Sequence, residues 1–292
     1  MRIDAHHHVW QLGRRPHAWL DDPGLAALRR DFGMAELAGQ ARAAGVGRTV
    51  LVQVLPDVEE TREFLALAAT EPMVAGVVGW VDLTSPAVAE TLAELREGPG
   101  GELLVGVRHL VQGEADPGWL ARPEVRRGLR AVAGAGLRYD LLTLPRQLPS
   151  AIETVRALPE LGFVLDHLSK PGIARGALQP WAGLLRELGR ESNVSCKLSG
   201  LVTEADHAEW TVNDLRPYAG TALEAFGPDR VMFGSDWPVC LLAADYRQVM
   251  DTADELTEGL APSERAEVFG GTADRVYRLG VATEPGAGED TP

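Results

Sequence analysis

The sequence has few cysteines, and we find no apolar leader in it. These two features bear on the compartment in which the protein is expected to work. Only Cys196 and Cys240 among its 292 residues are cysteines. Two cysteines cannot supply a disulfide framework, and we interpret both as small buried hydrophobic residues rather than a redox pair or a nucleophile. The amino terminus lacks a positively charged segment followed by an apolar run. We therefore expect a reduced, cytoplasmic protein without a signal peptide or a transmembrane span.

Positive charge is also scarce. The chain has 28 Lys and Arg against 42 Asp and Glu, which gives a formal net charge of -14. Phosphate binding needs a basic stripe, so this balance argues against a nucleic acid or an anionic membrane as the partner. The densest basic segment, residues 122–130, has the spacing of a solvated helix face. We expect a small molecule as the partner and leave a homodimer open.

Short β-branched runs recur along the chain and predict the strands of a parallel sheet. Several are almost entirely apolar, such as Val50-Leu51-Val52, which suits strands covered by helices on both faces. The predicted strands are residues 2–6, 48–53, 74–81, 103–109, 137–142, 162–166, 193–198 and 230–234.

Stretches with helical periodicity separate these runs, and several end in a glycine that is typical of a helix cap. The predicted helices are residues 34–44, 58–69, 86–96, 123–135, 148–158, 179–190, 205–225, 246–256 and 263–277. This alternation predicts an α/β protein, a single (β/α)8 TIM barrel over residues 1–281, with a disordered tail over 282–292. A doubly wound open sheet is the alternative, but no Gly-rich phosphate loop follows the first strand.

The first predicted strand runs directly into Asp4-Ala5-His6-His7-His8. Three histidines are too few for a purification tag, and no linker surrounds them. Because side chains alternate along a strand, His6 and His8 are predicted to point to the same side. They can therefore hold one ion or one substrate from a single strand end.

Two other predicted strands also end in polar groups, at Asp166-His167 and at residues 234–238, Gly-Ser-Asp-Trp-Pro. The carboxyl ends of barrel strands meet at one face, so these groups converge with the histidines. Alternation along the strand predicts His167 on one face and Asp166 on the other. Asp236 facing imidazoles can deprotonate water or join them around a divalent ion. A buried core histidine at His167 and a turn cap at Asp236 are the structural alternatives.

These motifs resemble the amidohydrolase superfamily, of the metal-dependent hydrolase type, and within it the branch of sugar-lactone and pyrone-dicarboxylate lactonases. The resemblance extends to about Leu279 and rests on six motifs in order. Besides residues 4–8, 166–171 and 226–238, they are Val107-Arg108-His109, Tyr139-Asp140-Leu141 and Cys196-Lys197-Leu198-Ser199-Gly200. It implies a lactonase, a carboxylic-ester hydrolase that opens a cyclic ester with Asp236 as general base and His167 beside it. The segments 16–20 and 106–148 are most similar to hydrolases of aldonolactones, such as L-fuconolactone or L-rhamnono-γ-lactone.

The resemblance also limits the metal centre. Binuclear members bridge two metals with a Lys or Glu from strand four and use a His from strand five, whereas strand four here ends in Arg108-His109 and strand five in Tyr139-Asp140. We therefore expect at most one divalent ion, zinc or manganese, and leave open whether activity requires it. Its predicted ligands are His6, His8, His167 and Asp236.

Further residues at the predicted barrel mouth are candidates for substrate binding, because they offer donors and flat apolar faces. They are Gln53, Trp80, Arg108, His109, Tyr139, Lys170, Lys197, Trp19 and Trp237. Core packing is the alternative for Trp80 and Trp237, and a solvated loop charge is the alternative for Lys170. Lys197 is predicted to point into the mouth, where an unpaired ammonium is costly, so a carboxylate or the substrate should satisfy it.

Two other functions remain open. One is a metal-dependent decarboxylase or amide hydrolase on the same scaffold, because a fold does not settle chemistry. The other is a non-catalytic carbohydrate-binding protein. We expect a neutral five- or six-membered sugar lactone rather than a dicarboxylated pyrone, because two carboxylates need several Arg or Lys partners and this chain is acidic.

Overall fold

A computed structural model describes residues 1–281, and eight parallel strands form the centre of this described part. The strands are β1 (Arg2–His7), β2 (Val46–Val52), β3 (Val74–Gly79), β4 (Leu104–His109), β5 (Arg138–Leu141), β6 (Phe163–Leu165), β7 (Val194–Leu198) and β8 (Val231–Phe233). Each strand pairs with the next one along the chain. All eight predicted strands are confirmed, with ends that differ by at most two residues. The predicted tail lies outside the described residues.

The segments after β8 pair with β1 and bring the two ends of the sheet together. Trp237 forms a parallel bridge with His7, and its carbonyl accepts a hydrogen bond from the amide of His8 at 2.7 Å. The amide of Asp236 donates to the carbonyl of His6 at 2.8 Å. The prediction of a (β/α)8 barrel is confirmed.

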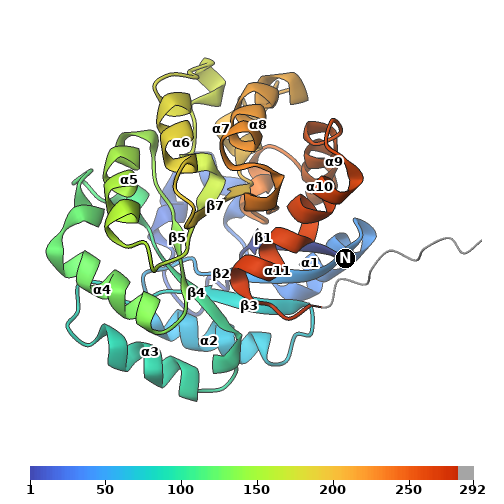
Figure 1. The fold of residues 1–292 in the computed structure, drawn as a ribbon. Helices are drawn as coiled ribbons and strands as arrows, with labels where there is room; N and C mark the ends of the chain where they lie inside the picture. Colours follow the sequence, from blue (N-terminus) through green and yellow to red (C-terminus); the bar gives the residue numbers. More distant parts are fainter. Residues whose placement is uncertain (282–292) are drawn as a thin grey trace, which may run out of the picture.

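Helices wrap the outside of the strands (Figure 1). They are α1 (Met34–Ala43), α2 (Val58–Ala68), α3 (Val88–Glu97), α4 (Pro123–Gly134), α5 (Leu148–Ala157), α6 (Trp181–Gly189), α7 (Leu201–Glu204), α8 (Val212–Phe226), α9 (Tyr246–Leu256), α10 (Pro262–Ala266) and α11 (Thr272–Tyr277). Their apolar faces pack against the outward side chains of the strands and form the larger hydrophobic core. In residues 1–281, no helix is both long and apolar enough to cross a membrane.

The inside of the barrel has an apolar floor beneath a polar upper part. α11, which lies beside the amino terminus, closes this floor (Figure 1). The floor residues are Ile3, Ala5, Val50, Val52, Val78, Val164 and Met232, packed with Ala273 and Tyr277 of α11. Charged and polar groups follow at the carboxyl ends of the strands, so the fold concentrates them at one end, on a rigid base.

Two predicted helices differ in the structure, one in its start and one by a division. The helix predicted over 205–225 begins only with α8, because Asp214 accepts hydrogen bonds from the amide and hydroxyl of Thr211 and caps the helix there. Residues 205–211 form a loop, and the short α7 ends before them at Glu204. The helix predicted over 263–277 is divided into α10 and α11 by a π-helical turn, Glu267–Gly271.

Candidate active site

β1 carries one extra residue, which turns two histidines into the barrel. Asp4 is paired with Thr49 and His7 with Leu51, so three steps on β1 match two on β2. The Nε2 atoms of His6 and His8 lie 3.2 Å apart, whereas His7 contacts the Thr49 hydroxyl. The structure thus places His6 and His8 on the same side, as predicted. His8 donates from Nδ1 to a backbone carbonyl, which leaves its Nε2 as an acceptor.

A left-handed turn, residues 167–170, follows β6. All four residues are non-glycine with φ between 50° and 60°, an arrangement that costs roughly 1–2 kcal/mol per residue. Trp181 donates to the Leu168 carbonyl at 2.6 Å, and Thr143 contacts the Ser169 hydroxyl at 2.8 Å. The predicted strand alternation at His167 is therefore wrong, because the strand ends at Leu165. The turn brings both Asp166 and His167 to the cluster.

Ser199 and Gly200 orient His167 from the end of β7. The Nδ1 atom of His167 is 2.8 Å from the Ser199 hydroxyl. A Cβ atom on Gly200, whose φ is +65°, would lie 2.7 Å from that Nδ1. Glycine is thus needed both for the backbone conformation and for the space taken by the ring. The Nε2 atom of His167 faces Asp236.

Asp236, which follows β8, lies among the three imidazoles. Its Oδ1 atom is 3.5 Å from Nε2 of His8, 3.7 Å from Nε2 of His6 and 3.8 Å from Nε2 of His167. In the described part of the chain, His6, His167 and Asp236 offer ligand atoms within 4.8 Å of one another. Two imidazole nitrogens and a carboxylate oxygen form a donor set suited to a divalent metal with an open coordination position.

The charges of this cluster favour an ionised Asp236 beside a neutral His167. Burial would raise the pKa of Asp236, but His167, His8 and His6 outweigh it and hold that pKa below its usual range. Burial lowers the pKa of His167 to about 4, although Asp236 and Asp166 act in the opposite direction. At neutral pH Asp236 is therefore a proton acceptor and His167 is uncharged.

Beneath the imidazoles, Lys197 is fully buried among acceptors. Its Nζ atom lies 2.6 Å from Asp140, 3.0 Å from Asp166 and 3.1 Å from Nδ1 of His6. The hydroxyl of Tyr277 donates to Asp140 and connects α11 to this network. Of the two partners predicted for Lys197, a carboxylate or the substrate, the structure shows the carboxylates of Asp140 and Asp166.

Arg108 forms the second buried ion pair. Its Nη1 atom lies 2.9 Å from Asp166 and 3.3 Å from Nε2 of His6. Its Nη2 atom donates to the backbone carbonyl and the side-chain oxygen of Gln53. Arg108 and Lys197 thus balance Asp140 and Asp166, which leaves the charge of Asp236 uncompensated by a fixed cation.

Trp80, His109 and Glu114 form a hydrogen-bonded chain after β3 and β4. Trp80 donates from Nε1 to Nδ1 of His109 at 3.1 Å, so the other ring nitrogen of His109 can donate to Glu114 at 2.9 Å. The ring of His109 also stacks on Trp119 with centroids 4.2 Å apart. This chain gives the mouth a rigid aromatic wall.

Lys170 and Glu204 form another pair, after β6 and β7. Their Nζ and Oε1 atoms are 3.5 Å apart, and about a quarter of each side chain is exposed. The pKa of Glu204 is raised, first by burial, while Lys170 opposes this and the charge of Asp236 adds to it.

Two residues predicted for substrate binding, Tyr139 and Trp237, lie elsewhere. Tyr139 faces outward from β5 and is fully buried against Phe163, since neighbours of the inward-facing Asp140 must point away from the barrel. Trp237 is also fully buried and packs against Phe32. Trp19 follows β1, is half-buried and packs against the core, and its predicted role at the mouth stays a prediction. The side chains of Tyr139 and Trp237 contribute to packing outside the barrel.

The sequence interpretation missed several residues of the cluster as site residues. Asp140 and Asp166 are its buried anions, Ser199 and Gly200 hold His167, and Glu204 pairs with Lys170. For Asp140 a signal existed, because a lone carboxylate in an apolar run, next to strands that carry Arg108 and Lys197, needs a partner. No comparable signal marks Glu204.

Comparisons with known proteins agree with this geometry. A family model described as amidohydrolase matches residues 3–279. The chain is 39% identical over 283 residues to an L-fucono-1,5-lactonase of Burkholderia ambifaria, covering 95% of this chain and 96% of the relative. It is 40% identical over 290 residues to an L-fucono-1,5-lactonase of Burkholderia multivorans, covering 96% of each.

A solved structure is also similar. It is the crystal structure of an amidohydrolase from Burkholderia multivorans with bound zinc, with a TM-score of 0.90 and 38% identity. The alignment covers 96% of this chain and 99% of that one.

Proposed function

Because the chain belongs to the amidohydrolase family, we propose that it hydrolyses a neutral sugar lactone to the aldonic acid. The two relatives of about 40% identity are named L-fucono-1,5-lactonase and align over nearly their whole length. L-fuconolactone is therefore the first substrate to test, and L-rhamnonolactone the second. Residues 1–281 serve as one catalytic domain, and a reduced cytoplasmic setting suits the two free, buried cysteines.

The charge balance of the buried cluster carries this proposal. Arg108 is paired with Asp166, and Lys197 with both Asp140 and Asp166. Neither cation is therefore free to neutralise a carboxylate of the substrate, which would lose several kcal/mol of hydration on entering the site. A neutral lactone needs no such partner, whereas a dicarboxylated pyrone needs two.

In the proposed mechanism, Asp236 acts as the general base. Its pKa lies below the usual range, so it is ionised throughout the neutral range, and it can accept a proton from water that attacks the lactone carbonyl. The ring oxygen is the leaving group, and the protonated Asp236 can return the proton to it. His8 directs its Nε2 at Asp236, 3.5 Å away, and so lies beside the water that Asp236 would deprotonate.

The developing negative charge on the carbonyl oxygen needs stabilisation. Arg108 is buried beside His6, and its Nε has no hydrogen-bond partner among the described residues, so this one donor can serve an oxyanion, to which a buried hydrogen bond is strong. Gln53 and Asp166 hold the guanidinium plane in place. The hydrogen-bond donors that stabilise the transition state would thus be oriented before the reaction begins.

A divalent metal fits the same donors. His6, His167 and Asp236 would hold it, with His8 adjacent, and it would supply Lewis acidity toward the lactone carbonyl. The zinc named with the related Burkholderia structure makes zinc the first metal to examine. In this site Ser199 keeps the Nδ1 side of His167 occupied, so its Nε2 remains directed at Asp236.

The proposal is tested by proton release in a weakly buffered indicator solution. We expect L-fuconolactone and related neutral aldonolactones to be opened well above their spontaneous rates, with a dicarboxylated pyrone at least tenfold poorer in kcat/KM. The assay is run with and without a chelator, and the metal content of each sample is determined. Absence of turnover on every lactone would refute the proposal, and better turnover of the dianion would refute its substrate.

A further inference from the structure

The chain uses lysine only twice, and both lysines belong to the barrel mouth. Of its 28 strongly basic residues, 26 are arginine, and the two lysines are Lys170 and Lys197. Lys197 is buried with three acceptors around its ammonium, a geometry that a planar guanidinium cannot match. Burial does not explain the use of lysine at position 170, because about a quarter of the Lys170 side chain is exposed.

The backbone places Lys170 at the site by a strained conformation. It is the last residue of the left-handed turn 167–170, with φ of 51°. The same turn carries His167, so the position of Lys170 is tied to the position of that imidazole. Glu204 ends α7, which begins directly after Gly200, the residue that packs against the ring of His167, so short segments join both members of the Lys170–Glu204 pair to the imidazole cluster.

The Lys170–Glu204 pair retains unused hydrogen-bonding capacity. Its separation of 3.5 Å exceeds the roughly 2.7–2.9 Å of a charge-assisted hydrogen bond. The ammonium has three donors and the carboxylate has lone pairs on two oxygens, and both groups reach solvent. A ligand with alternating donors and acceptors can therefore enter between or beside them.

We propose that Glu204 and Lys170 form a polyol subsite, in which Glu204 accepts hydrogen bonds from neighbouring hydroxyls of the sugar lactone and Lys170 donates to a hydroxyl oxygen. This inference rests on the proposed lactonase function and assigns its sugar specificity to a pair of residues. Hydroxyls both donate and accept, so they satisfy the two members of the pair together. Glu204 also repels a carboxylate at this position, which disfavours dianionic substrates.

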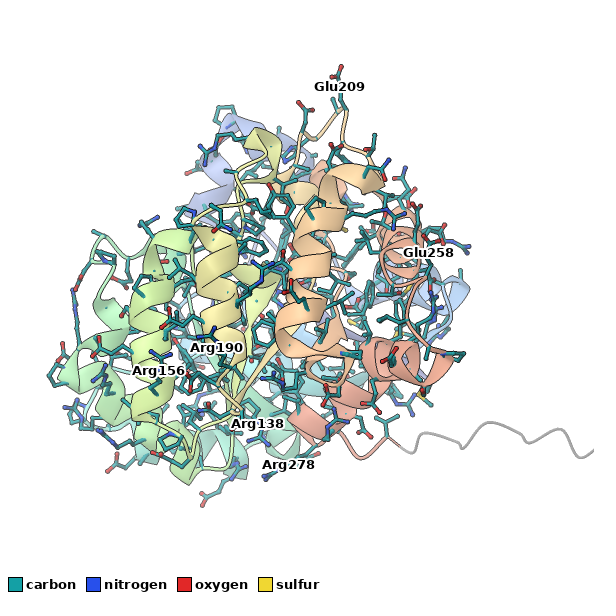
Figure 2. All side chains as sticks on the ribbon, turned by 45° about the horizontal axis from the view of Figure 1, so that its top comes forward. Arg138, Arg156, Arg190, Glu209, Glu258 and Arg278 are labelled. Atoms are coloured by element: carbon teal, nitrogen blue, oxygen red, sulfur yellow. The ribbon has the colours of Figure 1, made fainter. Side chains whose placement is uncertain are left out.

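The experiment compares Glu204→Gln with wild type on two lactones, L-fuconolactone and the unsubstituted δ-valerolactone. Loss of a charged hydrogen-bond partner should lower kcat/KM for the sugar lactone by roughly tenfold to hundredfold, mainly through KM. The value for δ-valerolactone should change less than threefold. Glu209→Gln is the matched control, because Glu209 lies in the loop that follows α7 but is exposed and points outward at the tip of that loop (Figure 2).

Comparing two lactones on one protein sample removes the effect of partial unfolding. The inference is overturned if Glu204→Gln keeps its KM for L-fuconolactone within twofold, or if both lactones lose activity equally. Lys170→Arg, which keeps the charge but changes its shape, should also lower the preference for the hydroxylated lactone. Failure of the proposed function gives a different result, because wild-type protein would then open no lactone.

Discussion

Lys197→Met provides a severe test of the buried charge network. The substitution keeps an apolar stem of similar length but removes the ammonium that lies between Asp140 and Asp166. Burial raises the pKa of Asp140 from 3.8 to about 6, although Lys197 opposes that rise. Without Lys197, two buried carboxylates share the single cation Arg108, so Asp140 must remain protonated in the folded state well above pH 6.

The magnitude follows from the protons bound in each state. Below about pH 6, Asp140 is protonated in the folded state of both proteins. Its titration therefore contributes equally to the pH dependence of the free energy of unfolding of wild type and variant. Above this pH the wild type releases the proton, whereas folded Lys197→Met retains it and the unfolded chain does not. The free energy of unfolding of the variant should then fall by about 1.4 kcal/mol for each further pH unit, or about 3 kcal/mol between pH 6 and 8.

Urea unfolding of wild type and variant at pH 6, 7 and 8 measures this difference. Losing the ion pair also lowers the free energy of unfolding by an amount that does not depend on pH. The slope of the free energy of unfolding against pH is therefore the informative quantity. The double variant Asp140→Asn/Lys197→Met removes the group that must be protonated, and its curve should run parallel to wild type. Parallel curves for the single variant and wild type would refute the reasoning.

Two further substitutions test the catalytic cluster. Asp236→Asn should lower kcat by roughly 10²- to 10⁴-fold, because it keeps the shape but removes the proton acceptor; activity of the folded variant within a few-fold of wild type would contradict the assignment. Gly200→Ala should lose activity and about 1–3 kcal/mol of stability, since its Cβ would lie 2.7 Å from the ring of His167 at a φ of +65°. The control Gly220→Ala adds a methyl group inside α8 with nothing within 4 Å and should be neutral or stabilising by up to about 1 kcal/mol.

The barrel and the imidazole cluster could be predicted because the relevant patterns are local. Apolar runs and helix periodicity depend on neighbouring residues, and they located every strand. His6 and His8 lie on one strand, and the parallel barrel brings Asp236 to the same end. Topology alone therefore predicted that His6, His8 and Asp236 converge, whereas the position of His167 depends on the turn after β6.

The left-handed turn 167–170 could not be predicted in the same way. Four consecutive non-glycine residues there have positive φ, which local preference disfavours, and tertiary contacts such as that between Trp181 and the Leu168 carbonyl maintain it. Strand alternation consequently failed at His167. The outward position of Tyr139 has a similar origin, because the inward direction on β5 is set by the pairing of Asp140 with Lys197 across the barrel.

The division of charge within the site explains where specificity can reside. Arg108 and Lys197 are held by buried carboxylates and by Gln53, so exchanging them would disturb the cluster itself. The wall of Trp80 and His109 and the Lys170–Glu204 pair are partly exposed and can vary without leaving a buried charge unpaired. Substitutions in the first group should therefore lower activity on every lactone, whereas those in the second should change the order of preference among lactones. The site thus separates the chemistry of ester hydrolysis from the choice of sugar.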